Sequence, residues 1–180
     1  MRIIAGEWRG RRIAAPSGNS VRPTLDRVRE AWMSIVHTSL PDARVLDLFA
    51  GSGALGLEAL SRGAGFVDFV ENNPRTFRVL RENVELLSAA GRCTLHCEDA
   101  LKYLLKYLTT AGGRSADSPA YDVGFADPPY GRNLAALLAD GWLKSPFSTI
   151  FGVEHESSAA LPVGGETRKY GDSAITIYRR

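Results

Sequence analysis

VLDLFAGSGALG, residues 45–56, is the stretch that decides the fold. The apolar run VLDLF predicts a buried strand, and a helical pattern begins behind the closely spaced glycines. Gly51, Gly53 and Gly56 match the spacing GxGxxG, in which glycines permit a tight turn and a close approach of backbone to ligand. The stretch therefore predicts a strand, a turn and a helix that build a nucleotide-type site at the carboxyl end of a parallel sheet.

Short apolar runs alternate with helical patterns along the rest of the chain. This alternation is typical of an α/β domain whose mostly parallel sheet is covered by helices on both faces. We expect strands at 44–49, 66–71, 92–97, 121–126 and 148–154, and a late strand at 174–178 that pairs with residues near 166–170. We expect helices at 24–36, 54–62, 74–88, 100–108 and 133–140, and a flexible loop at 111–120.

The length of 180 residues fits one domain, in which we distinguish a basic arm, 1–22, and a catalytic core, 23–180. No apolar run approaches the ~20 residues that span a bilayer, and the first residues lack the apolar segment of a signal peptide. We therefore expect a monomeric cytoplasmic protein with no membrane partner.

The two cysteines, Cys93 and Cys97, fall on one face of an expected strand, with His96 on the other face. A zinc site would need further ligands at suitable spacing, and none follows. We expect reduced core thiols and no metal.

Basic charge is concentrated at the start of the chain. Residues 1–29 contain seven arginines against Glu7 and Asp26, although the whole chain carries a net charge of only +2. Such a segment is either a solvated basic face or the contact surface for a polyanion, and the neighbouring tryptophan and glycines favour the second. The candidate contacts for this polyanion are Trp8, Arg9, Arg11, Arg12 and Arg22.

Charge also distinguishes the cofactors that the glycine loop could hold. Glu71 ends the next expected strand, where an acidic side chain can accept hydrogen bonds from ribose hydroxyls. Asp47 lies just before the turn, where it would repel the pyrophosphate of NAD but would favour the ammonium and sulfonium of S-adenosylmethionine. The Asp99 carboxylate could accept a hydrogen bond from the adenine amine, with the Asp99 or Ala100 backbone N–H donating to a ring nitrogen. Asp99 could instead cap the helix that begins at Ala100. The remaining candidate cofactor contacts are Phe49, Ala50 and Asn72, beside Gly51 and Gly53.

DPPY, residues 127–130, follows the apolar run 123–126 and cannot extend a strand. Two prolines remove backbone donors, so that the Asp127 carboxylate and the Pro128 carbonyl form a stiff pair of acceptors suited to an amino group, held by Pro129. Tyr130 can stack on a nucleobase that has left its helix. This combination predicts a site that orients an exocyclic base amine toward a methyl donor and stabilises the positive charge that develops on nitrogen.

Five segments together give a family resemblance: MRIIAGEWRGRR (1–12), RPTLDRVREAW (22–32), LDLFAGSGALGLEALSRGA (46–64), FVE (69–71) and DPPY (127–130). With these segments the chain resembles the RsmD-like family of bacterial 16S rRNA guanine-N2 methyltransferases. The resemblance implies a seven-stranded, Rossmann-like class I methyltransferase sheet with a short basic N-terminal β arm. It also implies methyl transfer from S-adenosylmethionine, leaving S-adenosylhomocysteine, to a guanine of 16S rRNA in the assembling small ribosomal subunit.

The resemblance adds Thr24, Asp26 and Arg27 as cofactor contacts, and makes the arginines of the arm phosphate contacts. The sequence departs from the family pattern after Glu71, where Asn72 stands in place of a further acidic residue. Two alternatives remain open at this stage: a DNA adenine-N6 methyltransferase, for which the chain has no room for a target-reading insertion, and a non-catalytic RNA-binding module of ribosome assembly. Residues 111–120 and 156–165 receive no function.

Overall fold

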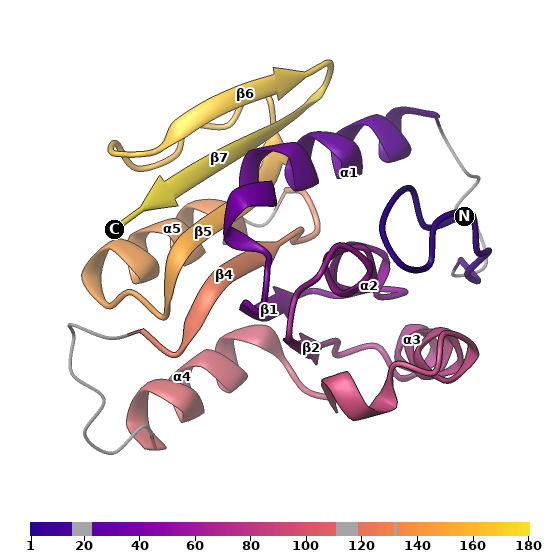
Figure 1. Ribbon diagram of the computed structural model, residues 1–180. Helices are drawn as coiled ribbons and strands as arrows, with labels where there is room; N and C mark the ends of the chain where they lie inside the picture. The colour runs from indigo at the N-terminus through magenta and orange to yellow at the C-terminus, as the bar shows by residue number, and fades with distance from the viewer. Residues whose placement is uncertain (16–22, 111–118, 132) are drawn as a thin grey trace.

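The computed structural model describes residues 1–15, 23–110, 119–131 and 133–180. In this part of the chain the strands form one seven-stranded sheet in the order β3-β2-β1-β4-β5-β7-β6 (Figure 1). The strands are β1 Arg44–Leu48, β2 Phe66–Val70, β3 Cys93–His96, β4 Tyr121–Ala126, β5 Ser148–Glu156, β6 Glu166–Tyr170 and β7 Ser173–Arg179. The first five are parallel, whereas β7 is antiparallel to both β5 and β6. The predicted α/β class and the mostly parallel sheet are confirmed.

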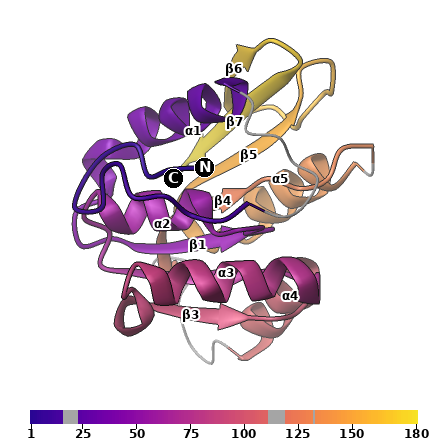
Figure 2. The same ribbon diagram turned by 90° about the vertical axis from the view of Figure 1, so that its right-hand side faces the viewer.

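Helices cover both faces of the sheet (Figures 1 and 2). They are α1 Pro23–Val36, α2 Ala54–Ser61, α3 Pro74–Leu86, α4 Ala100–Thr110 and α5 Leu134–Lys144, with short 3-10 turns at His37–Ser39 and Ala90–Arg92. One core joins α1, α2, α3 and the N-terminal arm to one face, and a second core joins α4 and α5 to the other. Strands β1, β2, β4 and β5 are consequently buried over most of their length, whereas the edge strand β3 is only partly buried and its Thr94 is exposed.

Several element ends differ from the expected positions, and tertiary contacts explain two of the extensions. Helix α5 runs on to Lys144 through Gly141, because the indole N–H of Trp142 donates to the Ser148 carbonyl at 3.0 Å and anchors the last turn to β5. Strand β5 continues to Glu156 because β7 pairs with it as far as Glu156 opposite Ser173. Tertiary contacts therefore override the local breaking effect of glycine.

The N-terminal arm, which we define as residues 1–15, packs beside α2 (Figure 1). A single antiparallel bridge, between Arg2 and Arg12, takes the place of the expected β arm, and the Ile3 N–H donates to the Arg11 carbonyl at 3.0 Å. Glu7 N–H donates to the Ser61 carbonyl at 2.7 Å, which ties the arm to the end of α2. Within the described residues, no helix has the length and apolar character needed to cross a membrane.

Candidate functional site

The carboxyl ends of β1, β4 and β5 meet at one edge of the sheet. The register places Leu48 beside Ala126 and Ala126 beside Val153, so the residues that follow these three positions are neighbours. They border a pocket of about 200 Å³. Its lining residues come from the arm, α1, the glycine loop and the ends of β4 and β5: Met1, Val28, Arg29, Trp32, Asp47, Phe49, Ala50, Gly51, Ser52, Ala54, Leu55, Asp127 and Glu154.

The glycine loop forms one wall of this pocket for two separate steric reasons. Gly51 has a φ of +58°, and a Cβ there would meet only the Phe49 carbonyl oxygen, at 4.0 Å, so its backbone has open space on that side. At Gly56 a Cβ would lie 2.3 Å from Cε1 of the buried Phe69. The first glycine permits a left-handed turn facing the pocket, and the second lets α2 pack against the sheet.

Asp47 is buried at the end of β1, where its Oδ2 accepts a hydrogen bond of 2.9 Å from the Gly56 N–H. Burial raises the pKa of Asp47 to about 7, with a further contribution from the negative charge of Glu71, although the Gly56 N–H opposes the shift. A carboxylate in this position is costly to ionise without a positive partner, so the pocket favours a cationic ligand.

Glu71 links the end of β2 to the glycine loop. Its Oε2 accepts from the Gly51 N–H at 2.9 Å and its Oε1 from the Asn73 N–H at 2.7 Å. Each oxygen of a carboxylate has a second acceptor position, so Glu71 can still bind a hydroxyl group. The neighbouring Asn72 is exposed, and Asn73 caps α3.

Asp99 acts as the N-cap of α4. Its Oδ1 accepts from the backbone N–H groups of Leu101 and Lys102, both at 3.0 Å, and Ala100 is buried at the start of the helix. The capping alternative for Asp99 is confirmed, while a contact with adenine stays a prediction.

The DPPY segment leaves β4 at the edge of the pocket. Asp127 is accessible to solvent from the pocket, yet removal of part of its hydration by the surrounding protein raises its pKa, and the charges of Glu154 and Asp47 raise it further. Pro128 is buried, which fixes the segment against the sheet. Tyr130 is 45% exposed, and its hydroxyl lies 2.7 Å from Ser173 Oγ. The structure thus brings Asp127 and Asp47 to one pocket, and the partly exposed Tyr130 lines a second pocket that shares Glu154 with it.

Glu154 is a pocket residue that sequence reasoning missed. It follows Val153 in β5, is only 7% exposed, and accepts from the Trp32 indole at 3.5 Å and from the Tyr130 hydroxyl at 3.4 Å. Burial raises its pKa, although these donors oppose the shift. The sequence signal was present, since an acidic residue that interrupts an apolar strand near its carboxyl end has the same pattern as Asp47 in β1.

Helix α1 contributes different residues to the pocket from those predicted. The side chains of Thr24 and Asp26 lie outside the described residues, as does Arg22, and Arg27 is exposed. The pocket-lining positions of α1 are Val28, Arg29 and Trp32.

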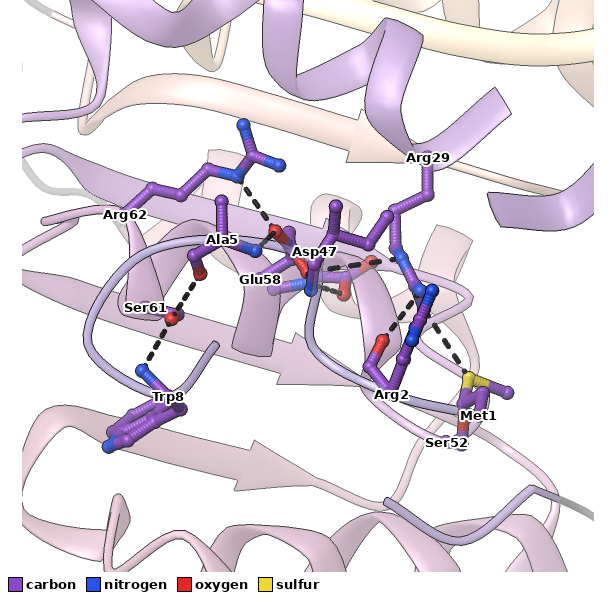
Figure 3. A network of polar contacts seen from close by, with 12 residues as sticks. Met1, Arg2, Ala5, Trp8, Arg29, Asp47, Ser52, Glu58, Ser61 and Arg62 are labelled. Atoms are coloured by element: carbon purple, nitrogen blue, oxygen red, sulfur yellow. Dashed lines mark hydrogen bonds and ion pairs between the residues drawn. The ribbon is translucent and has the colours of Figure 1, made fainter. Parts of the chain in front are cut away.

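Figure 3 shows how the arm is fixed beside the pocket. Glu58 of α2 is fully buried and accepts from the Ile4 and Ala5 N–H groups at 2.8 and 3.0 Å and from Arg62 Nε at 2.8 Å. Arg29 Nη2 donates to the Arg2 carbonyl at 2.7 Å, and Arg29 Nε lies 4.0 Å from Glu58 Oε2. We call Arg2, Ile4, Ala5, Arg29, Glu58 and Arg62 the arm anchor.

The predicted RNA contacts in the arm separate into two groups. Trp8 is corrected to a core residue, because it is only 6% exposed and its backbone N–H donates to Ser61 Oγ at 2.9 Å. Its ring contacts the Arg92 guanidinium, so the ring face is not available for stacking on RNA. Arg9, Arg11 and Arg12 are exposed, and Arg11 donates to the Leu86 carbonyl at the end of α3. Arginine side chains therefore form most of the accessible charged surface of the arm, beside the exposed Glu7.

Among the described residues, no group of three or more histidine, cysteine or acidic side chains could hold a metal ion. Both cysteines are free, as expected, and burial raises the pKa of Cys93 to about 11. The expectation that both are core thiols is wrong for Cys97, which is exposed because it lies one residue beyond the end of β3.

Comparison with known proteins gives consistent results. A family model described as "Conserved hypothetical protein 95" matches residues 1–179. Ribosomal RNA small subunit methyltransferase D of Escherichia coli K12 is 37% identical over 90% of this chain and 78% of its own length. Putative rRNA methyltransferase YlbH of Bacillus subtilis is 34% identical over 100% of this chain and 99% of its own length.

A solved structure, the putative methyltransferase yhhF from Escherichia coli, is 32% identical and superimposes with a TM-score of 0.80. The match covers 100% of this chain and 97% of that chain. The described fold is therefore the Rossmann-like fold of S-adenosylmethionine-dependent methyltransferases.

Proposed function

We propose that this protein methylates the N2 amine of a guanine in 16S rRNA of the small ribosomal subunit. The chain belongs to the RsmD family, which the model "Conserved hypothetical protein 95" describes, and the proposal starts from this membership. The methyl donor in this proposal is S-adenosylmethionine. The observation that carries the proposal is the position of Asp127, at the edge of an acidic pocket bordered by the glycine loop. The names of the relatives supply the RNA class.

The pocket residues fit S-adenosylmethionine. Asp47, Asp127 and Glu154 all line the pocket, and loss of hydration raises the pKa of each, so a cationic ligand would relieve the cost of their charges. Gly51 leaves space for close approach of the ligand to the backbone. When bound, S-adenosylmethionine supplies an electrophilic methyl group on a sulfonium.

The residues of the DPPY segment would act by position and charge. The Asp127 carboxylate and the Pro128 carbonyl accept the two hydrogens of the guanine amine, which favours a pyramidal nitrogen with its lone pair directed at the methyl donor. As the N–CH3 bond forms and the S–CH3 bond of the donor breaks, the Asp127 carboxylate stabilises the positive charge on nitrogen. One proton of the amine then passes to this carboxylate or to solvent, which gives neutral N2-methylguanine and S-adenosylhomocysteine. The exposed ring of Tyr130 replaces part of the stacking that the target base loses when it leaves its helix, roughly 1 to 3 kcal/mol.

The arm supports RNA as the substrate. Arg9 and Arg12 are exposed on a segment that the arm anchor joins to α2, which itself begins at the glycine loop. Contacts between these arginines and phosphates would hold the RNA in register without reading its sequence.

The test is methyl transfer from methyl-labelled S-adenosylmethionine to small subunits or 16S rRNA isolated from cells that lack this protein, with nucleoside mass spectrometry to identify the product. We expect N2-methylguanine with the wild-type protein. Asp127→Ala should lower transfer by about 100-fold or more, the loss typical of a group that stabilises transition-state charge, with cofactor affinity close to normal.

The matched control is Asp140→Ala, which removes an exposed carboxylate of α5 that pairs with Lys144. This variant should transfer methyl groups at the wild-type rate. Labelling of DNA alone would instead identify a DNA methyltransferase, and RNA binding without any transfer would identify a non-catalytic module.

A further inference from the structure

Glu154 occupies a position that the proposed methyl transfer does not by itself require. Ala126 of β4 is in register with Val153 of β5. Asp127 and Glu154, which come next in the chain after these two residues, are therefore neighbours. Glu154 lines the 200 Å³ pocket and also a second pocket, of about 150 Å³, which Pro128, Pro129 and Tyr130 line as well. It therefore lies beside the place where Asp127 would hold the target amine.

The surroundings of Glu154 leave it able to accept further hydrogen bonds. The Trp32 indole donates to Oε2 at 3.5 Å and the Tyr130 hydroxyl to Oε1 at 3.4 Å, and both contacts are long. The Ser173 side chain also hydrogen-bonds this carboxylate. The two oxygens of an ionised carboxylate accept about four hydrogen bonds in all, so one position remains for a further donor. Three donors directed at one carboxylate also fix its orientation.

We propose that Glu154 is a specificity-determining residue that accepts a hydrogen bond from the ring N1–H of the target guanine, while Asp127 accepts from the adjacent N2 amine. The proposal rests on the proposed guanine-N2 methylation. It assigns to the two neighbouring carboxylates the two neighbouring donors on the Watson–Crick edge of guanine.

This pairing separates guanine from the other bases that carry an amine. In guanine the amine is adjacent to a ring N–H donor, whereas in adenine and cytosine it is adjacent to a ring nitrogen with a lone pair. A second carboxylate beside Asp127 would oppose that lone pair and leave both groups without a donor. Glu154 therefore favours guanine as the target base and disfavours methylation of the N6 amine of adenine in DNA.

The experiment uses Glu154→Gln, which keeps an acceptor oxygen for Tyr130 or Trp32 but replaces the other oxygen with an amide N–H donor. The probes are small subunits reconstituted with 16S rRNA that carries either guanosine or 2-aminopurine riboside at the position the wild-type protein methylates. 2-Aminopurine keeps the amine at C2 but has a lone pair at N1. Initial rates are measured at saturating S-adenosylmethionine, so that a change in cofactor affinity does not alter the measured rates.

We expect the wild-type protein to prefer guanosine over 2-aminopurine by about 10- to 100-fold, the effect of one hydrogen bond to a charged group. Glu154→Gln should lower kcat/KM on guanosine by a similar factor and bring the ratio of the two substrates close to one, because its amide N–H can donate to N1 of 2-aminopurine. A role in folding alone would lower both rates and leave the ratio unchanged.

Two further variants test whether Glu154 contacts the base directly or acts through Tyr130. Glu156→Gln makes the same chemical change at an exposed position two residues further along β5, and should preserve both rate and ratio. Tyr130→Phe removes the hydroxyl that contacts Glu154 but keeps the ring. If Glu154 acts on the base directly, Tyr130→Phe keeps the guanosine preference; if it acts only through Tyr130, this variant reproduces the loss of preference and the proposal is wrong.

The outcomes also separate this proposal from the proposed function. A wild-type protein that forms no N2-methylguanine overturns both. A wild-type protein that forms it, together with a Glu154→Gln variant whose substrate ratio is unchanged, overturns only the role of Glu154.

Discussion

Replacing Asp47 with asparagine should change cofactor affinity and protein stability in opposite directions. Asp47 is 3% exposed, its pKa is about 7 against an ordinary value of 3.8, and burial is the main cause. Asparagine has nearly the same shape and its Oδ1 can still accept the Gly56 N–H, so the substitution removes the charge and little else.

The sign of the stability effect follows from the raised pKa. A carboxyl group that binds its proton more tightly in the folded protein stabilises the fold at low pH, and this contribution is lost as the pH rises from about 4 to about 7. At 1.36 kcal/mol per pH unit, a pKa raised from 3.8 to about 7 corresponds to a penalty of about 4 kcal/mol for the ionised group. The buried amide of asparagine has its own desolvation cost, so we expect a net gain of about 1 to 2 kcal/mol for Asp47→Asn at pH 8. In a chain of this size that gain raises Tm by roughly 2 to 8 °C.

Affinity for S-adenosylmethionine should respond in the opposite way. If the ionised carboxylate binds the cation, wild-type affinity falls about tenfold for each pH unit below 7, and Asp47→Asn loses both this dependence and about 10-fold or more in affinity at pH 8. Calorimetric titration at pH 6 and pH 8, with thermal unfolding of the unliganded protein at the same pH values, measures both effects.

Asp140→Asn, an exposed aspartate on α5, is the control and should change neither quantity. An Asp47→Asn variant that binds the cofactor as tightly as the wild-type protein at pH 8 would refute the assignment of Asp47 to the cationic ligand. A variant with lower Tm at pH 8 would show that the carboxylate stabilises the fold.

Three further predictions concern the elements around the pocket. Glu58→Ala should lower the free energy of unfolding by about 3 to 5 kcal/mol in urea titrations, because it leaves the buried Arg29 and two arm N–H groups without the carboxylate they contact. The control Glu82→Ala, on the exposed side of α3, should have little effect on this free energy. Gly56→Ala should destabilise by about 1 to 3 kcal/mol through the clash with Phe69, while Gly141→Ala, where a Cβ meets nothing within 4 Å, should stabilise by about 0.5 to 1 kcal/mol. Joint replacement of Arg9 and Arg12 by alanine should weaken RNA binding. It should also reduce the slope of log K against log salt by roughly 0.7 to 0.9 for each phosphate that the arm no longer neutralises. The control Arg168→Ala, on β6, should leave the slope unchanged, and an unchanged slope for the arm variant would exclude the arm as the phosphate-binding segment.

The sequence was sufficient for the fold because its local signals agree with one another. The glycine loop, the apolar strands and the helical patterns all indicate βαβ units, and the structure confirms every expected helix and strand within a few residues. The exceptions, at α5 and β5, arise where a partner distant in sequence stabilises the last turn or the last pair of residues. Periodicity within a short window contains no information on such partners.

The candidate site was only partly predictable, for a related reason. Asp47 near the end of β1 and Asp127 after β4 both stand beside sequence motifs, but Glu154 joins them only through the register between β4 and β5. Trp8 was assigned to RNA because aromatic residues in a basic segment often stack on bases, yet here the arm folds back on α2 and buries the ring. In both cases the deciding interaction joins residues more than 20 positions apart.

The position of the arm has a consequence for how substrate and cofactor sites are related. Arg29 contacts the Arg2 carbonyl and also lines the pocket, and Glu58 holds Ile4 and Ala5 against α2, the helix that begins at the glycine loop (Figure 3). A change in the arm anchor would therefore alter the pocket wall and the exposed arginines together. If the proposed function is correct, phosphate contacts on the arm and the amine contact at Asp127 are set at a fixed separation. A folded RNA that presents both groups at that separation would satisfy them without the ordering entropy that a flexible strand would lose on binding.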